Sequence, residues 1–180
     1  MHIALYQPDI AQNTGTILRL CACLGLEAHI IEPAGFPSSD RALRRAGMDY
    51  LDAVKLTRHS SWDGFERWRI GRGSLVARNP GEVPRLILFS TRARTSYLDC
   101  PFMPDDVLLF GRESAGVPEA VHAAADVRLA IPLREGLRSL NVAMAAAIAA
   151  GEALRQTGGM SVWDDAQKFG RAGLTLPETP

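Results

Sequence analysis

The feature that most constrains this chain is a repeated pattern of short apolar runs, each followed by a loop rich in glycine, proline and polar residues. The clearest examples lie within Asp106–Ala150, where Val107–Phe110 and Val127–Ile131 each lead into such a loop and then into a helix-like segment. Short apolar runs that alternate with helical segments are typical of the parallel strands of an α/β fold. In open sheets of this kind, ligands bind beyond the carboxyl ends of the strands. These two loops are therefore where we expect a ligand site.

Both loops contain residue types that suit a binding site. The first loop, Gly111–Pro118, has two glycines that permit close backbone approach or a positive φ, and its proline suits the first turn of a helix. The second loop spans 131–141, and both Ser139 and Asn141 can cap the alanine-rich helix that follows. We expect the two loops to line one cleft.

Other short apolar runs supply the remainder of the sheet. We expect four more strands, at His2–Tyr6, Ala28–Glu32, Ala53–Leu56 and Arg85–Phe89. A helix is expected to begin at Asn13, which can cap it, and to end at Gly25. The pattern predicts one α/β domain over residues 1–156, with a mostly parallel sheet and helices on both faces, followed by a tail at 157–180.

Composition narrows the class of protein further. The chain has 180 residues, of which 47% are hydrophobic, and no apolar run approaches the roughly 20 residues that a membrane helix needs. Cys21, Cys23 and Cys100 are odd in number and lack metal-ligand spacing, so we expect reduced core thiols and no metal site. The formal net charge is zero, so any basic surface must be local. A cytoplasmic protein is the simplest interpretation.

Two arginine-rich segments are candidates for a local basic surface. Arg41, Arg44 and Arg45 lie in a helical pattern, and the stretch from Trp62 to Val83 interleaves arginines with aromatic residues. Guanidinium groups match phosphate oxygens, and aromatic rings can stack on unpaired bases. A solvated helix face explains the first group equally well, and an ordinary amphipathic helix, Trp62–Ile70, explains the aromatic residues of the second, so the sequence leaves these alternatives open.

Three separated motifs together resemble those of the SPOUT RNA methyltransferases. The motifs are Asn13-x-Gly15-x-Ile17-x-Arg19, Leu109-Phe110-Gly111-x-Glu113-x-x-Gly116-Val117-Pro118, and Ile131-Pro132 through Arg138-Ser139-Leu140-Asn141. Within that superfamily, the opening of the chain and residues 43–50 are similar to the tRNA (cytidine-34/uridine-34) 2'-O-methyltransferases, which modify the wobble nucleotide. The similarity covers approximately residues 2 to 156.

The resemblance implies properties that residue patterns alone do not give. It implies S-adenosylmethionine as the cofactor, a tRNA anticodon loop as the substrate, a homodimer, and a deep C-terminal trefoil knot, which periodicity cannot predict because threaded chains are rare. It assigns cofactor contacts to Phe89, Gly111, Ile131, Leu133, Ser139 and Leu140. It assigns catalysis to Arg19, Asn13, Glu113, Arg138 and Asn141. Because a guanidinium scarcely deprotonates, Arg19 is expected to hold a phosphate and stabilise the ribose alkoxide.

Some features depart from the family pattern and leave alternatives open. Ala143-Met144 occupy positions where relatives usually carry a second Ser-Asn pair, and the arginine-rich stretch near Ile70–Pro80 is an addition. Another tRNA or rRNA position, or a binding module without catalysis, therefore stays possible as a function. Glu113 has a second interpretation as a carboxylate that braces its loop. The smooth alanine face of Val142–Ala150 is expected at or near a dimer interface.

Overall fold

The computed structural model describes residues 1–37, 43, 51–72 and 83–159. Its strands are β1 (His2–Tyr6), β2 (Glu27–Ile31), β3 (Leu56–His59), β4 (Leu86–Phe89), β5 (Thr95–Ser96), β6 (Val107–Phe110) and β7 (Val127–Ala130). Its helices are α1 (Ala11–Leu24), α3 (Trp62–Arg72), α4 (Glu119–Ala124) and α5 (Val142–Thr157), with a 3-10 turn η1 (Tyr97–Asp99).

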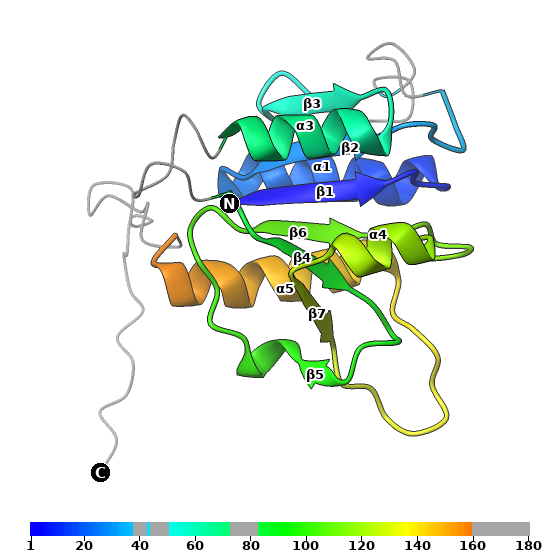
Figure 1. Ribbon diagram of the computed structural model, residues 1–180, viewed down its shortest axis with the longest axis vertical. Helices are drawn as coiled ribbons and strands as arrows, with labels where there is room; N and C mark the ends of the chain where they lie inside the picture. The colour runs from blue at the N-terminus through cyan, green and yellow to red at the C-terminus, as the bar shows by residue number, and fades with distance from the viewer. Residues whose placement is uncertain (38–42, 44–50, 73–82, 160–180) are drawn as a thin grey trace, which may run out of the picture.

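The described strands form one all-parallel sheet of seven strands in the order β3-β2-β1-β6-β4-β7-β5 (Figure 1). The chain builds from β1 outward to β3 and then crosses to the other half of the sheet. The direction of winding therefore reverses beside β1 and β6. A reversal of this kind leaves a crevice at the carboxyl ends of the strands, where ligands bind in such sheets.

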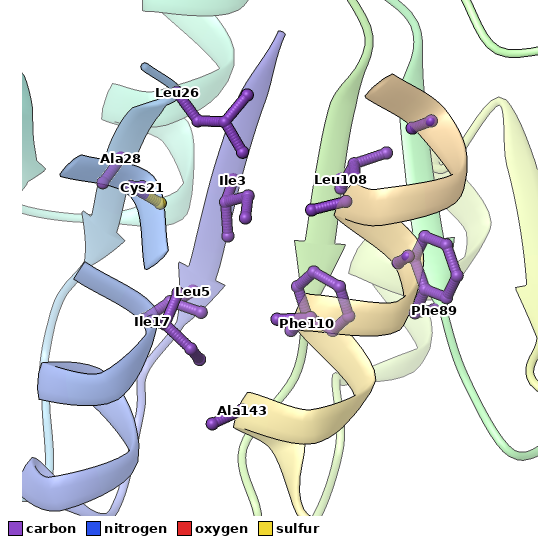
Figure 2. Close-up of a cluster of buried hydrophobic side chains, with 14 of the residues drawn as sticks. Ile3, Leu5, Ile17, Cys21, Leu26, Ala28, Phe89, Leu108, Phe110 and Ala143 are labelled. Carbon is purple, nitrogen blue, oxygen red and sulfur yellow. The ribbon is translucent and has the colours of Figure 1, made fainter. Parts of the chain in front are cut away.

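Helices cover both faces of the sheet, as the sequence pattern predicted. Because neighbouring side chains of a strand point to opposite faces, Ile3 and Leu5 of β1 join the core under α1 and α5, whereas Ala4 and Tyr6 join the core under α3 and α4. Figure 2 shows the first of these cores, with α1 and α5 lying over β1 and β6. The fold class predicted from sequence, an α/β protein with a parallel sheet, is confirmed.

The alanine-rich face of α5 is packed inside the chain. Ala146, Ala149 and Ala150 are fully buried, in a core that includes α1 and β6 residues. The exposed side of the helix carries Met144 and Ile148, which are 50% and 38% exposed. The smooth alanine face is therefore not available to a second copy, and the reason we gave for a dimer contact on this helix is wrong.

Two local predictions also differ from the structure. The strand expected at Ala53–Leu56 is instead β3, Leu56–His59, because these residues pair with β2 and the residues before them form a turn. Cys23 is exposed, whereas Cys21 and Cys100 are buried as expected. Among the described residues, no helix is both long and apolar enough to cross a bilayer.

Candidate active site

The carboxyl ends of β4, β6 and β7 open onto a cavity of about 580 Å³. Its walls come from the loop after β4, the glycine loop after β6, the loop after β7, the first turn of α5 and the start of α1. This volume lies in the range typical of small-molecule sites, about 300–1,000 Å³. The cavity is thus where the sequence placed the cleft, at the carboxyl edge of the sheet.

Most of the site residues expected from sequence line this cavity. All six expected cofactor contacts do so: Phe89, Gly111, Ile131, Leu133, Ser139 and Leu140. Four of the five expected catalytic residues do so as well: Asn13, Glu113, Arg138 and Asn141. The fifth, Arg19, is an exposed residue of α1 and does not line the cavity of its own chain.

The glycine loop is a tight hairpin that needs both of its glycines. The backbone groups of Arg112 and Gly116 exchange two hydrogen bonds, of 2.9 and 2.8 Å. A Cβ on Gly111 would lie 2.6 Å from the carbonyl carbon of Gly116, and Gly116 itself has a φ of +68°. Close approach therefore requires the first glycine, and a left-handed backbone favours the second.

Asp9, which sequence reasoning missed, anchors this hairpin to the end of β1. Its Oδ1 accepts from Arg112 Nε and Nη2 at 3.2 and 2.8 Å, and its Oδ2 accepts from the Ser114 backbone N–H at 3.1 Å and from the Ser114 hydroxyl. The Arg112 guanidinium and the Ser114 donors lower the pKa of Asp9 to about 2. The sequence did contain a signal for Asp9, because this acidic residue follows the buried strand β1 at the carboxyl edge of the sheet.

A second polar chain joins the glycine loop to both neighbouring helices. Glu113 Oε2 accepts from the Asp9 N–H at 2.9 Å, and Glu113 Oε1 accepts from Asn13 Nδ2 at 3.0 Å. Asn141 Nδ2 donates to Asn13 Oδ1 at 2.9 Å, while Asn141 Oδ1 caps α5 by accepting from the Ala143 N–H at 2.8 Å. Both oxygens of Glu113 thus brace the loop, in agreement with its second interpretation.

This network corrects one prediction about capping and supports another. Asn13 does not cap α1, because the N-cap is Ile10, which has no side-chain capping bond. The Asn13 side chain instead bridges Glu113 and Asn141. Asn141 caps α5 as expected, whereas Ser139 lines the cavity.

The cavity wall combines apolar side chains with charged groups of both signs. Phe89, Ile131 and Leu133 provide apolar surface, and Arg112, Arg138 and Glu113 provide charge. Such a lining suits an elongated ligand that has an aromatic part and charged groups, because apolar contacts supply affinity and a few polar groups fix orientation.

The arginine-rich segments have a mixed outcome. Phe65 is completely buried, and Arg69, 8% exposed, pairs with Glu66 and Asp126 and donates to the Pro84 carbonyl. The helix alternative is therefore right for 62–72, and base stacking by Phe65 is wrong. Arg41, Arg44, Arg45 and Arg78 lie outside the described residues.

Comparison with known proteins shows the family to which this chain belongs. Residues 1–151 match the model of the SpoU rRNA Methylase family. The chain belongs to this family. SpoU relatives include a tRNA (cytidine(34)-2'-O)-methyltransferase of Beijerinckia indica subsp. indica, which is 61% identical over 92% of this chain and 98% of its own length.

Solved structures of SpoU relatives agree with this membership. One, described as giving structural insights into the 2-OH methylation of C/U34 on tRNA, is 42% identical, covers 86% of this chain and 94% of its own, and has a TM-score of 0.75. An AdoMet-bound rRNA methyltransferase from Sinorhizobium meliloti is 26% identical over 86% of this chain and 55% of its own, with a TM-score of 0.71. Both structures therefore share their fold with most of this chain.

Proposed function

We propose that this SpoU-family chain is a tRNA 2'-O-methyltransferase that methylates the ribose of the wobble nucleotide, cytidine or modified uridine at position 34. The observation that carries the function is 61% identity over 92% of the chain to a tRNA (cytidine(34)-2'-O)-methyltransferase. The cavity at the carboxyl edge of the sheet supports locating the active site there. We place the enzyme in the cytoplasm, where its tRNA substrate is processed.

The cofactor that fits the cavity is S-adenosylmethionine. Ile131, Leu133 and Leu140 would hold the adenine in an apolar slot, and Ser139 would supply a polar contact. Glu113 brings a carboxylate and Arg138 a guanidinium to the wall, which suit the cationic and anionic ends of an amino-acid group. When bound, S-adenosylmethionine supplies an electrophilic methyl group. The residues that line the cavity therefore fit S-adenosylmethionine. Methyl transfer from this cofactor needs no metal ion in the cavity.

The chain's own residues have to position the ribose and stabilise its oxygen. Alignment of nucleophile and methyl group can supply up to about 7–11 kcal/mol of the barrier. The Glu113–Asn13–Asn141 chain holds three parts of the wall in fixed relation, which favours such alignment. A nearby cation stabilises the oxygen as its proton leaves, and this task falls to Arg19.

Arg19 does not line the cavity of its own chain. It lies six residues after Asn13 on α1, which is about 9 Å along the helix axis and about 240° around it. We assign the enzyme a homodimer in which Arg19 of each copy serves the cavity of the other. Exposed Met144 and Ile148 on α5 and Ile10 before α1 supply apolar surface for this contact.

A mixed-dimer experiment tests this assignment. Arg19→Ala and Gly111→Ala chains are co-expressed with different affinity tags and assayed at a low cofactor concentration, at which each variant alone should have little activity. Random pairing should restore about a quarter of wild-type activity, because half of the dimers are mixed and one of their two sites is intact. Failure to restore activity in purified mixed dimers would mean that Arg19 does not act across the interface. Sedimentation of the wild type as a monomer at micromolar concentration would remove the dimer itself.

We assign the C-terminal part of the domain a trefoil knot. Cys100 and Phe102, which follow β5, share the core with α5. Gln156 near the end of α5 accepts from the Phe102 N–H at 3.0 Å and donates to the Cys100 carbonyl at 3.1 Å. This proximity supports a path in which α5 passes behind the 97–106 segment. An experimental trace of 90–157 without a threaded crossing would overturn it.

Nucleoside mapping tests the function itself. Labelled methyl transfer to total tRNA from a strain lacking the gene should give one product, a 2'-O-methylated nucleoside at position 34. Anticodon stem-loops whose wobble ribose is already methylated serve as the control and should accept no label. Incorporation into those stem-loops, or into rRNA alone, would favour another position, and absence of transfer with intact binding would favour a binding module.

A further inference from the structure

Three buried histidines form a continuous hydrogen-bonded row across β1, β2 and β3. These strands contribute no residue to the cavity. His2 begins β1, His29 lies in β2 and His59 ends β3, and they are 2%, 1% and 6% exposed. His29 Nδ1 lies 3.0 Å from His59 Nε2, and His29 Nε2 lies 3.2 Å from His2 Nδ1. Trp68 of α3 covers the row, with its ring centroid 4.0 Å from that of His29.

Glu27 at the start of β2 adds a carboxylate to one end of this row. One ring nitrogen of His2, one of His29 and one Glu27 oxygen all lie within 4.8 Å of one another. The His2 Nδ1 is 3.6 Å from Glu27 Oε2. Ligand atoms at about 2.0–2.1 Å from a tetrahedral zinc ion are separated by roughly 3.3 Å. The separations of 3.2 and 3.6 Å are therefore close to those of a metal site.

The contact between His29 and His59 also suits a metal ligand. If the His29 Nδ1–H donates to His59 Nε2, the His29 Nε2 keeps a lone pair directed at His2. An outer hydrogen bond of this kind orients most metal-bound histidines.

We propose that His2, His29 and Glu27 bind a divalent transition metal ion of the zinc class, with His59 as the partner that orients His29. Two imidazoles and a carboxylate are a ligand set that zinc accepts. The ion joins the amino ends of β1 and β2 beneath α3. Its role is structural, because residues of β1, β2 and β3 are absent from the cavity lining.

Two basic residues already share Glu27 and compete with an ion for it. Lys55 Nζ lies 2.7 Å from Glu27 Oε1, and Arg72 Nη1 lies 3.4 Å from Glu27 Oε2. Arg72 also lies over the Trp68 ring, 5.5 Å from its centroid, so it has a second favourable contact when it releases the carboxylate. Removal of the competing charge by Arg72→Gln should therefore strengthen metal binding severalfold if Glu27 is a ligand.

Zinc titration of the untagged, chelator-treated protein tests the site. Calorimetry should give one ion per chain, and a zinc concentration about a hundred times the Kd should raise the Tm by roughly 5–10 °C. His29→Gln and Glu27→Gln should each weaken binding at least about tenfold, since each removes one ligand. His122→Gln is the matched control, because His122 lies in α4 and outside this cluster, and it should bind like the wild type.

The two ligand variants keep the test decisive if one of them does not fold. His29 is buried, whereas the Glu27 side chain is 23% exposed, so Glu27→Gln should remain folded. Cobalt in place of zinc should also quench the fluorescence of Trp68, which lies against His29. Absence of zinc binding, or binding that is equal in wild type and Glu27→Gln, would overturn the proposal and leave the histidines as a neutral hydrogen-bonded chain.

Discussion

The Asp9 anchor of the glycine loop leads to a quantitative prediction for Asp9→Asn. The substitution keeps the size of the side chain but removes its charge and turns one acceptor into a donor. That donor faces either Arg112 or the two donors of Ser114, so at least one set of hydrogen bonds is lost. The loop then loses part of its attachment to the chain after β1, while the Glu113 bond to the Asp9 N–H and the backbone bonds between Arg112 and Gly116 remain.

The size of the effect follows from the exposure of the groups involved. The side chains of Arg112 and Asp9 are 40% and 19% exposed, so their ion pair contributes at most about 1 kcal/mol. A lost hydrogen bond to Ser114 adds about 1 kcal/mol. A loop destabilised by about 2 kcal/mol lowers the apparent cofactor affinity by up to about thirtyfold, the limit being reached when the loop is mostly disordered before binding.

Cofactor binding and turnover separate this role from a general loss of structure. Calorimetry should show weaker S-adenosylmethionine binding by Asp9→Asn, and the cofactor KM should rise while kcat at saturating cofactor stays within about twofold of wild type. Asp63→Asn, the same change in the exposed first turn of α3, is the control and should leave both constants unchanged. Wild-type cofactor affinity in Asp9→Asn would refute the anchoring argument.

Three further predictions concern the same loops. Gly111→Ala should weaken cofactor binding at least tenfold and destabilise the fold by about 1–3 kcal/mol, because the added Cβ would lie 2.6 Å from the carbonyl carbon of Gly116. Gly151→Ala is the control, since a Cβ there meets no atom within 4 Å, and it should be neutral or stabilising in urea unfolding. Asn141→Ala should cost about 1 kcal/mol in the same assay, since it removes the cap of α5. The pKa of Asp9 in the folded protein is about 2, below its ordinary value of 3.8. The stabilisation from the Asp9 carboxylate is therefore complete above pH 3.8 and is lost as the pH falls through about 2. The melting temperatures of wild type and Asp9→Asn should converge near pH 2.

The strands that are buried on both faces were the ones that sequence patterns predicted best. The expected His2–Tyr6 and Val107–Phe110 match β1 and β6 residue for residue, because every side chain in them is buried and the apolar run has clear ends. β3 was displaced because it is an edge strand whose Thr57 and Arg58 interrupt the apolar pattern. Its position depends on pairing with β2, which local sequence does not encode.

The cavity residues were predictable because motifs mark the loops that follow β6 and β7. Asp9 was missed because its partner Arg112 lies 103 residues away along the chain. The histidine row was missed for the same reason, since His2, His29 and His59 meet only through the order of β1, β2 and β3. Contacts of this kind follow from strand order, which the resemblance to a family supplies and periodicity does not.

The register of β1 against β6 explains why Asp9, in the loop after β1, can determine the shape of the glycine loop after β6. Leu5 pairs with Phe110, so the chain after β1 and the chain after β6 leave the sheet side by side. Asp9 lies four residues after Leu5, and Arg112 lies two residues after Phe110. At these positions the Asp9 carboxylate and the Arg112 guanidinium are 2.8 Å apart. A slip of one residue would move Asp9 by about 3.3 Å and break both sets of bonds. The geometry of the proposed cofactor loop is therefore a consequence of strand pairing at the point where the sheet reverses direction.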